Sequence, residues 1–211
     1  MVGECIVVDN HSNDRTYEIA QKFGCRIVRE SVRQISRVRN TGAKAAYGSY
    51  LIFVDADTIV PPSTFLQALG ALKGGKIACG GARLSFDHDY GRKISGKFLP
   101  ALWNFISERF KFFAGSFIFC TKDLFFQCGG FPETHYAGEE IILSKNLKKE
   151  CKKRDKELLV ISSPSVISSA RKLVWYSDWS MLKMIFPLLG IPFLLRYQKA
   201  CTFWYNRPTN D

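Results

Sequence analysis

The sequence predicts an α/β fold in which a mostly parallel sheet is flanked by helices. Apolar runs rich in β-branched and aromatic residues alternate with helix-forming segments, so that residues 5–54 follow the order strand, helix, strand, helix, strand. The run at residues 50–54, Tyr-Leu-Ile-Phe-Val, is apolar throughout, which is typical of a strand buried on both faces. It stops at two carboxylates, Asp55 and Asp57. Ligands of open α/β sheets bind beyond strand ends of this kind.

The first part of the chain supplies the beginning of this sheet. We expect strands at residues 5–9, 26–29 and 50–54 and helices at about 14–23 and 36–47. Residues 10–14 include the polar types that cap a helix N-terminus, and Gly24 and Gly48 suit helix ends. Because right-handed crossovers keep such strands parallel, Asp9 should end its strand in the same sheet, and at the same edge, as the carboxylate pair.

The second part continues the alternation of helices and strands. We expect helices at about 61–72, 91–113, 122–127 and 139–155, and strands at 76–79, 82–86, 117–120 and 158–166. Pro61 and Pro62 suit the first turn of a helix, whereas Pro100 should break or kink one. Glycines at 80 and 81 are expected to interrupt a strand. We interpret the lysines of residues 148–156 as the solvated outer face of the last helix.

Residues 172–211 form a predicted helical tail rich in aromatic side chains, beyond a main domain that covers residues 1–171. The longest uncharged stretch of the tail, residues 184–195, is shorter than the ~20 apolar residues that a membrane-spanning helix needs. The tail therefore either lies on a bilayer surface as a peripheral contact or packs back on the domain, and an amphipathic stretch alone does not separate the two.

Composition narrows the class of protein. A length of 211 residues suits one domain with a sizeable core. The balance of 30 basic to 19 acidic residues, a net charge of +11, favours anionic partners such as nucleotides, phosphates or acidic lipids. No nucleic-acid-binding motif accompanies the charge, so we expect no nucleic-acid partner. The seven cysteines have neither zinc-site nor disulfide-framework spacing, and the N-terminus has no basic and apolar leader, which together predict a cytoplasmic protein with reduced thiols.

The carboxylate pair after the central strand is the first candidate site. Alternation along an extended segment would send Asp55 and Asp57 to the same side, where both could face one divalent cation. Hard oxygen donors of this type suit Mg²⁺ or Mn²⁺ better than zinc. The alternative is a solvated loop that begins with two acidic residues, and the pair alone does not decide between them.

Five motifs in the chain resemble those of family 2 glycosyltransferases, which have the GT-A fold. In order they are residues 7–16 (Val-Val-Asp-Asn-His-Ser-Asn-Asp-Arg-Thr), 39–42 (Arg-Asn-Thr-Gly), 53–57 (Phe-Val-Asp-Ala-Asp), 129–133 (Gly-Gly-Phe-Pro-Glu) and 138–140 (Gly-Glu-Glu). Each motif is modest alone, but their order matches the family over most of the chain up to residue 171. The resemblance implies a Rossmann-type GT-A sheet and an inverting, metal-dependent transfer of a sugar.

The resemblance also implies how a UDP- or GDP-sugar donor would bind. Asp9 would hydrogen-bond the nucleotide base, and Arg39 would lie along the nucleotide or its diphosphate. Asp57 would bind the Mg²⁺ or Mn²⁺ that bridges the diphosphate, with Asp55 assisting through the ribose or a metal-bound water. Arg171, in a basic turn after the last strand, would reach the diphosphate, although an ordinary surface charge is an equal alternative.

On the acceptor side, the resemblance implies a catalytic base on the last helix. Glu140 occupies the second position of what is usually Glu-Asp in the family, so it would take the proton from the hydroxyl of a glycan or lipid-linked acceptor. The glutamate is one methylene longer than the usual aspartate. Glu139 beside it, and the loop that contains Gly129, Gly130 and Phe131, would shape the donor-sugar and acceptor pocket.

The N-terminus departs from the family pattern. Family members begin with a strand and helix before the position of Glu4, and that strand forms one wall of the base pocket. The sequence therefore leaves three alternatives: a shortened relative, a reading frame called late, or a wall supplied by a partner such as a second copy in a homo-oligomer. A catalytically silent relative that binds a nucleotide or a partner is the competing function. If the protein is instead an active sugar transferase, we expect it to act at the cytoplasmic face of a membrane.

Overall fold

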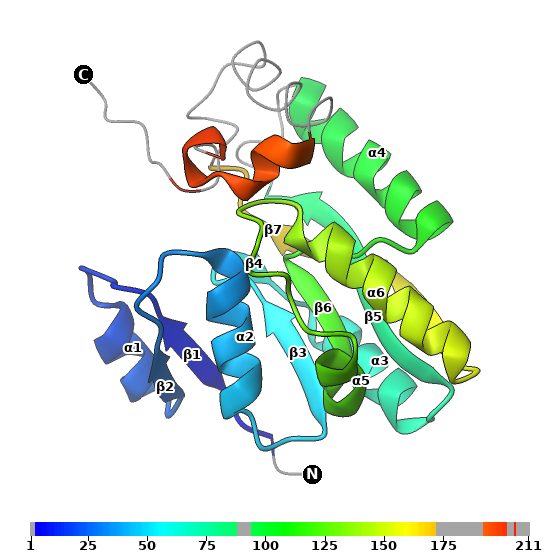
Figure 1. Ribbon diagram of the computed structural model, residues 1–211, viewed down its shortest axis with the longest axis horizontal. Coiled ribbons are helices and arrows are strands. Elements are labelled where there is room, and N and C mark those ends of the chain that lie inside the picture. Colours follow the sequence, from blue (N-terminus) through cyan, green and yellow to red (C-terminus); the bar gives the residue numbers. More distant parts are fainter. Residues whose placement is uncertain (1–2, 88–93, 172–191, 202–204, 206–211) are drawn as a thin grey trace.

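The computed structural model of the protein describes residues 3–87, 94–171, 192–201 and 205 (Figure 1). Its strands are β1 (Ile6–Asp9), β2 (Arg26–Arg29), β3 (Tyr50–Val54), β4 (Thr58–Ile59), β5 (Ile77–Phe86), β6 (Phe117–Thr121) and β7 (Glu157–Ser168). Its helices are α1 (Thr16–Lys22), α2 (Ile35–Ala45), α3 (Pro62–Lys73), α4 (Ile94–Phe110), α5 (Lys122–Gln127) and α6 (Glu139–Lys153), followed by the 3₁₀ helices η1 (Pro192–Arg196) and η2 (Gln198–Ala200). The predicted α/β class is confirmed.

The strands form two separate sheets. β1 and β2 make a parallel pair, and the other five strands follow the order β3-β6-β5-β7-β4. β6 runs antiparallel to both β3 and β5, so the larger sheet is mixed and not mostly parallel. The reason is that the chain re-enters this sheet at the end where it left it: after α4, Phe113 lies against Gly81 of β5, and β6 begins beside it.

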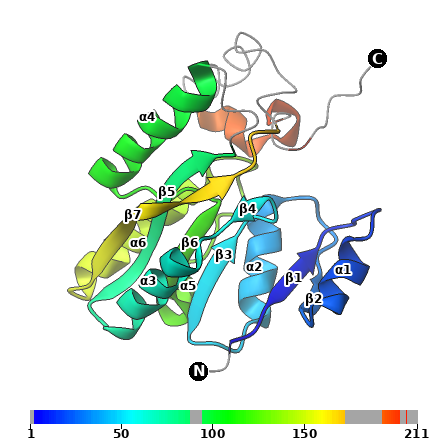
Figure 2. The same cartoon turned by 180° about the vertical axis from the view of Figure 1, so that it is seen from behind.

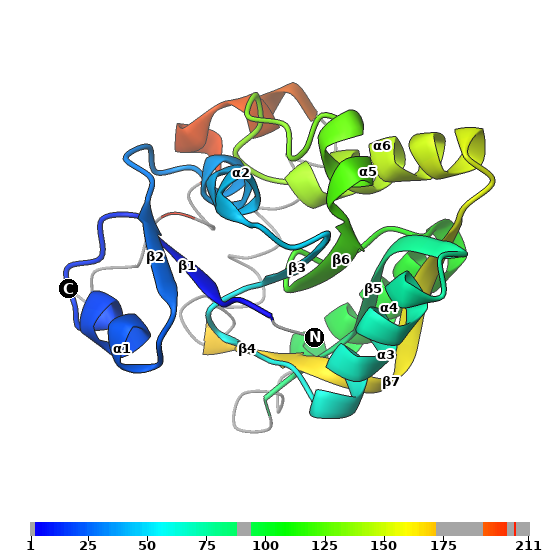
Figure 3. The ribbon, with the colours of Figure 1, turned by 90° about the horizontal axis from the view of Figure 1, so that it is seen from below.

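The separation of the sheets corrects one expectation. Asp9 ends β1 in the two-stranded sheet, whereas Asp55 and Asp57 follow β3 at the edge of the five-stranded sheet. In Figures 2 and 3 the β1–β2 pair lies beside β3, and α1 covers the pair on its outer side. No residue of β1 or β2 is fully buried. The two-stranded sheet is therefore the less densely packed part of the described structure.

Helices cover both faces of the five-stranded sheet. On one face, α2, α5 and α6 enclose a cluster that includes Leu51, Ile118 and Leu143 (Figure 3). On the other face, α3 packs against Phe117 and Phe119. Successive β6 side chains point to opposite faces, so the four buried residues 117–120 of this strand serve both clusters. The alternation explains why the segment is apolar without a break.

The structure corrects two predictions: the strand is not interrupted at Gly80 and Gly81, and the helix is not broken at Pro100. β5 passes straight through Gly80 and Gly81, where the sequence predicts an interruption. A side chain at Gly80 would overlap Phe119 and the backbone of β7, so glycine allows close strand packing here. α4 likewise continues through Pro100. Most of the predicted tail lies outside the described residues.

The described part of the tail packs on the domain. The Tyr136 amide donates to the Leu195 carbonyl at 2.7 Å, and the Ile35 amide donates to the Tyr205 hydroxyl at 3.2 Å. Cys201 is fully buried. This segment therefore covers the start of α2 and the loop before α6. Among the helices that the structure describes, none has the length and apolar content that a membrane span requires.

Candidate functional site

Arg39 on α2 is the centre of the candidate site. Its Nη2 donates to Asp55 Oδ1 at 2.7 Å and to the Gly115 carbonyl at 3.1 Å, while Nη1 donates to Glu139 Oε1 at 2.9 Å. The guanidinium also lies 5.1 Å from the ring centre of Phe131. One side chain thus joins α2, the end of β3, the segment before β6 and the start of α6.

Burial and the neighbouring charges shift the pKa of Arg39 in opposite directions. Its side chain is only 11 % exposed, and burial alone favours the neutral form. The nearby carboxylates of Asp55 and Glu139 more than offset this effect, so the pKa of Arg39 is raised. Because the guanidinium stays charged and its fork is occupied by protein acceptors, it fixes Asp55 and Glu139 relative to each other.

Asp55 and Asp57 occupy a turn that is open to solvent. The Thr58 amide donates to the Asp55 carbonyl at 3.0 Å, which closes the turn between β3 and β4. The side chains of Asp55 and Asp57 are 43 % and 38 % exposed. Arg171 Nη2 lies 3.3 Å from Asp57 Oδ2, because pairing of β4 with β7 brings the end of β7 to this turn. Each aspartate therefore has its own arginine partner.

The carboxylate pair fits a divalent cation only when other oxygen atoms complete the coordination. Within the described ranges, no group of three or more His, Cys, Asp or Glu side chains is arranged to hold a metal. Mg²⁺ commonly takes one or two carboxylates and fills its remaining positions with water and phosphate oxygens. The open carboxylates of Asp55 and Asp57 suit that kind of shared site.

Glu139 and Glu140 begin α6 after Gly138, which has a left-handed backbone with φ of 70°. Glu139 is buried and bound to Arg39. Burial of Glu140, together with the negative charge of Glu139, raises the pKa of Glu140 to about 8. A carboxyl with this pKa exchanges protons near neutral pH, as a general base must. Glu140 is thus the residue of this pair that is suited to proton transfer.

The glycine-containing loop is held against α2 by Asn40. The Phe131 amide donates to Asn40 Oδ1 at 3.0 Å, and Asn40 Nδ2 donates to the Phe131 carbonyl at 2.9 Å. Gly129 and Gly130 have φ values of 89° and 67°, which other residues rarely adopt. Phe131 itself is buried beneath Arg39. The loop therefore packs against the Arg39 cluster through the ring of Phe131.

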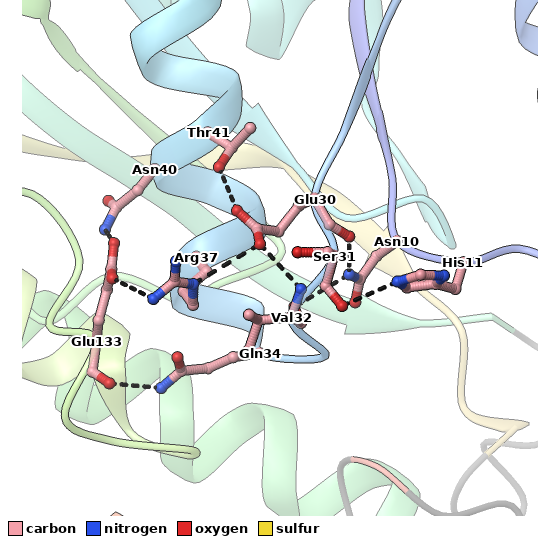
Figure 4. Close-up of polar contacts among 10 residues, drawn as sticks. All are labelled: Asn10, His11, Glu30, Ser31, Val32, Gln34, Arg37, Asn40, Thr41 and Glu133. Atoms are coloured by element: carbon pink, nitrogen blue, oxygen red, sulfur yellow. Dashed lines mark hydrogen bonds and ion pairs between the residues drawn. The ribbon is translucent and has the colours of Figure 1, made fainter.

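A second polar network extends from this loop toward β2 (Figure 4). Arg37 Nη1 donates to Glu133 Oε2 at 3.1 Å, and Arg37 Nε lies 3.7 Å from Glu30 Oε1. Glu30 Oε2 accepts from the Thr41 hydroxyl at 2.7 Å, and the Glu133 carbonyl accepts from Gln34 at 2.7 Å. Glu133 belongs to the loop at residues 129–133 that was expected to shape the pocket, and Asn40 and Thr41 lie within the motif at residues 39–42. No pattern in the sequence indicates Glu30 or Arg37.

The structure brings most of the predicted site residues together and leaves Asp9 apart. Asp9 Oδ1 accepts from the Ser12 amide at 3.0 Å, and hydrogen bonds with the side chain and the amide of Ser12 lower the pKa of Asp9. It has no hydrogen bond or ion pair to the Arg39 cluster among the contacts of the described residues. A hollow of about 570 Å³ on the outer face of α6 also lies apart; it is lined by Lys145, Lys148, Lys149, Lys152, Asp155, Lys156 and Leu158.

A comparison with protein families identifies the chain. The model of the family described as Glycosyl transferase family 2 matches residues 3–131, more than half of the sequence. The chain belongs to glycosyl transferase family 2. The uncharacterized glycosyltransferase EpsJ of Bacillus subtilis (strain 168) is 37 % identical over 67 residues, which cover 29 % of this family 2 chain and 20 % of EpsJ.

Solved glycosyltransferases share the fold of this family 2 chain. The mannosyltransferase PcManGT of Pyrobaculum calidifontis, in complex with GDP-Man and Mn²⁺, has a TM-score of 0.55 at 18 % identity, covering 98 % of this chain and 56 % of that one. Glucosyl-3-phosphoglycerate synthase of Mycobacterium tuberculosis, with Mn²⁺, UDP and glucosyl-3-phosphoglycerate, has a TM-score of 0.60 at 17 % identity, covering 92 % and 69 %. The chain thus spans little more than half the length of PcManGT. At these identities the likeness shows the fold, which confirms the GT-A architecture.

Proposed function

We propose that this chain transfers a hexosyl-type sugar from a UDP- or GDP-sugar to a hydroxyl group of a lipid-linked or polysaccharide acceptor, with inversion at the anomeric carbon. The observation that carries the proposal is the cluster around Arg39. It ties Asp55, the first carboxylate of the strand-end pair, to Glu139, the neighbour of the candidate base Glu140. Donor-binding and proton-accepting groups therefore share one rigid centre.

On the donor side, Asp57 and Asp55 would hold Mg²⁺ or Mn²⁺ together with the diphosphate. When bound, such a cation stabilises the negative charge of the departing nucleoside diphosphate as a Lewis acid. Arg171, already beside Asp57, would add hydrogen bonds to the diphosphate. Arg39 would position Asp55 and lie along the nucleotide, and Asp9 would hydrogen-bond the base. Supporting this, the structures of PcManGT and the M. tuberculosis synthase were determined with Mn²⁺ and a guanosine or uridine nucleotide.

On the acceptor side, Glu140 would remove the proton from the attacking hydroxyl. The acceptor oxygen bonds to the anomeric carbon while the bond from that carbon to the diphosphate oxygen breaks, and attack from the opposite face inverts the configuration. Glu139 would not act as the base, because Arg39 already occupies its carboxylate. Gly129, Gly130 and Phe131 would keep this part of the pocket in place. The work would be done in the cytoplasm, at a membrane that carries the acceptor.

Calorimetry with UDP and with GDP tests the donor side. In the presence of Mn²⁺ we expect binding of at least one nucleotide, and we expect EDTA to abolish it. The competing function is a silent module that binds a nucleotide or a partner, and the thinly packed β1–β2 sheet that carries Asp9 favours it. That module would bind nucleotide without transferring any sugar. If neither nucleotide binds with Mn²⁺ present, sugar transfer and the nucleotide-binding form of the silent module are both rejected for this chain, and only a partner-binding module is left.

A further inference from the structure

Two thiols face each other where β1 and β2 begin. Cys5 directly precedes β1 and Cys25 directly precedes β2, and the parallel register pairs the next residues, Ile6 and Arg26. The Arg26 amide donates to the Cys5 carbonyl at 2.8 Å, which holds the two backbones at strand spacing. The two Sγ atoms are 3.2 Å apart. A disulfide needs about 2.05 Å between sulfurs, so a side-chain adjustment of about 1 Å suffices.

We propose that Cys5 and Cys25 form a reversible disulfide that links β1 to β2 when the protein meets a peroxide-class oxidant. One thiolate attacks the peroxide oxygen, which breaks the O–O bond and yields a sulfenic acid and water. The second thiol then attacks the sulfenic sulfur, forming the S–S bond and releasing a second water. Overall, two thiols lose two electrons and two protons, and one hydrogen peroxide becomes two waters. A dithiol reductant reverses the modification by thiol exchange.

Access distinguishes this pair from the second pair of neighbouring thiols. Cys5 is exposed and Cys25 is half-buried, so a small oxidant can reach them. Cys79 and Cys151 are also in contact, with Sγ atoms 3.6 Å apart, but both are completely buried. The hydrogen bond to Cys151, with burial, raises the pKa of Cys79 far above its usual range. Cys79 and Cys151 therefore serve as a control pair, because their thiols are close together but inaccessible to an oxidant.

The position of the proposed bond gives it a structural consequence. Among the described residues, β1 and β2 share ladder hydrogen bonds only with each other, and neither contains a fully buried side chain. A covalent link between residues 20 positions apart would close a loop that contains β1 and α1 and ends just before β2, and so restrict the unfolded states of this unit. Asp9 is the last residue of β1 in this unit. Oxidation should thus suppress local opening of the segment between the two cysteines.

Peptide mapping of the full chain tests the proposal. The folded protein is treated with hydrogen peroxide, its remaining thiols are blocked with N-ethylmaleimide, and it is then digested and analysed by mass spectrometry. We expect a Cys5–Cys25 linked peptide within one molecule, lost on treatment with dithiothreitol and absent in Cys5→Ser and in Cys25→Ser. The Cys79→Ser variant should still form it. Partial burial and the neighbouring thiol raise the pKa of Cys5, so formation should become faster between pH 7 and pH 9.

Limited proteolysis measures the structural effect. Cleavage by trypsin after Lys22 should be at least about tenfold slower in the oxidised protein than in the reduced protein, because the link lowers the population of the open form. Cys25→Ser treated in the same way should show no change. The absence of the linked peptide, a link between two molecules, or equal cleavage rates would each overturn the proposal.

Discussion

Replacing Glu140 by Gln tests the proposed base directly. The change keeps the shape of the side chain and removes its ability to accept a proton. We expect sugar transfer to fall by about 10²-fold or more, the scale that is typical of losing a positioned general base, while nucleotide and metal binding stay the same. Binding should be retained because the ion-pair partners of Asp55 and Asp57 are Arg39 and Arg171, which the substitution leaves in place.

The raised pKa of Glu140 makes the effect depend on pH. With a pKa of about 8, only about a tenth of the Glu140 carboxyl groups are ionised at pH 7. In the wild type, kcat/KM should therefore rise about tenfold per pH unit below 8 and level off above it. The residual activity of Glu140→Gln should lack this rise.

The pH dependence of the free energy of unfolding tests the same pKa independently of activity. A folded-state pKa raised from 4.5 to about 8 means that Glu140 contributes stability below pH 4.5 and loses it progressively as the pH rises through 8. The difference of 3.5 pH units, at about 1.4 kcal/mol each, sets an upper limit of about 5 kcal/mol. Because Glu139 shares this charged environment, we expect the wild type to lose about 2–3 kcal/mol relative to Glu140→Gln between pH 5 and pH 9.

Assays of transfer, calorimetry and urea unfolding at several pH values separate these effects. Glu150→Gln is the matched control, since it removes an acid near the other end of the same helix, where a hydrogen bond from Lys153 lowers the pKa of Glu150. That control should change neither transfer nor the pH dependence of stability by a comparable amount. Transfer by Glu140→Gln at more than a tenth of the wild-type rate, with the same pH profile, would refute the role of Glu140.

Three further predictions concern the neighbouring groups. Asp57→Ala should abolish Mn²⁺-dependent nucleotide binding in calorimetry, and Asp55→Ala should weaken it less; unchanged affinity in EDTA would contradict a metal role. Arg39→Ala should lower the free energy of unfolding in urea by about 3–5 kcal/mol, because it leaves Asp55 and buried Glu139 without their cation; a loss under 1 kcal/mol would show that the cluster is not a structural centre. Ending the chain at residue 171 should reduce flotation with acidic liposomes if the tail binds bilayers, and equal flotation would leave it a packing segment only.

The sequence alone determined the identity of the motifs and the order of most elements, although it did not predict β4 and divided β5 into two strands. Strands such as β6 and helices such as α6 were predictable because apolar period and helix-ending residues act over a few positions. The strand-end aspartates and the Glu139–Glu140 pair were likewise visible as local patterns. The family model matches residues 3–131, a range that includes the aspartates but not the two glutamates. Local signals of this kind do not say which strands pair.

Only the tertiary structure decided how these pieces meet. It placed β6 antiparallel between β3 and β5 and put Asp9 in a separate sheet, because strand pairing depends on where distant segments return to the sheet. It also showed that Arg39 binds two carboxylates that lie 16 and 100 residues away along the chain. The sequence around a charged residue does not indicate which distant residues it will pair with. Burial, which raises the pKa of Glu140 and hides Cys79 while leaving Cys5 open, exists only once the chain has folded.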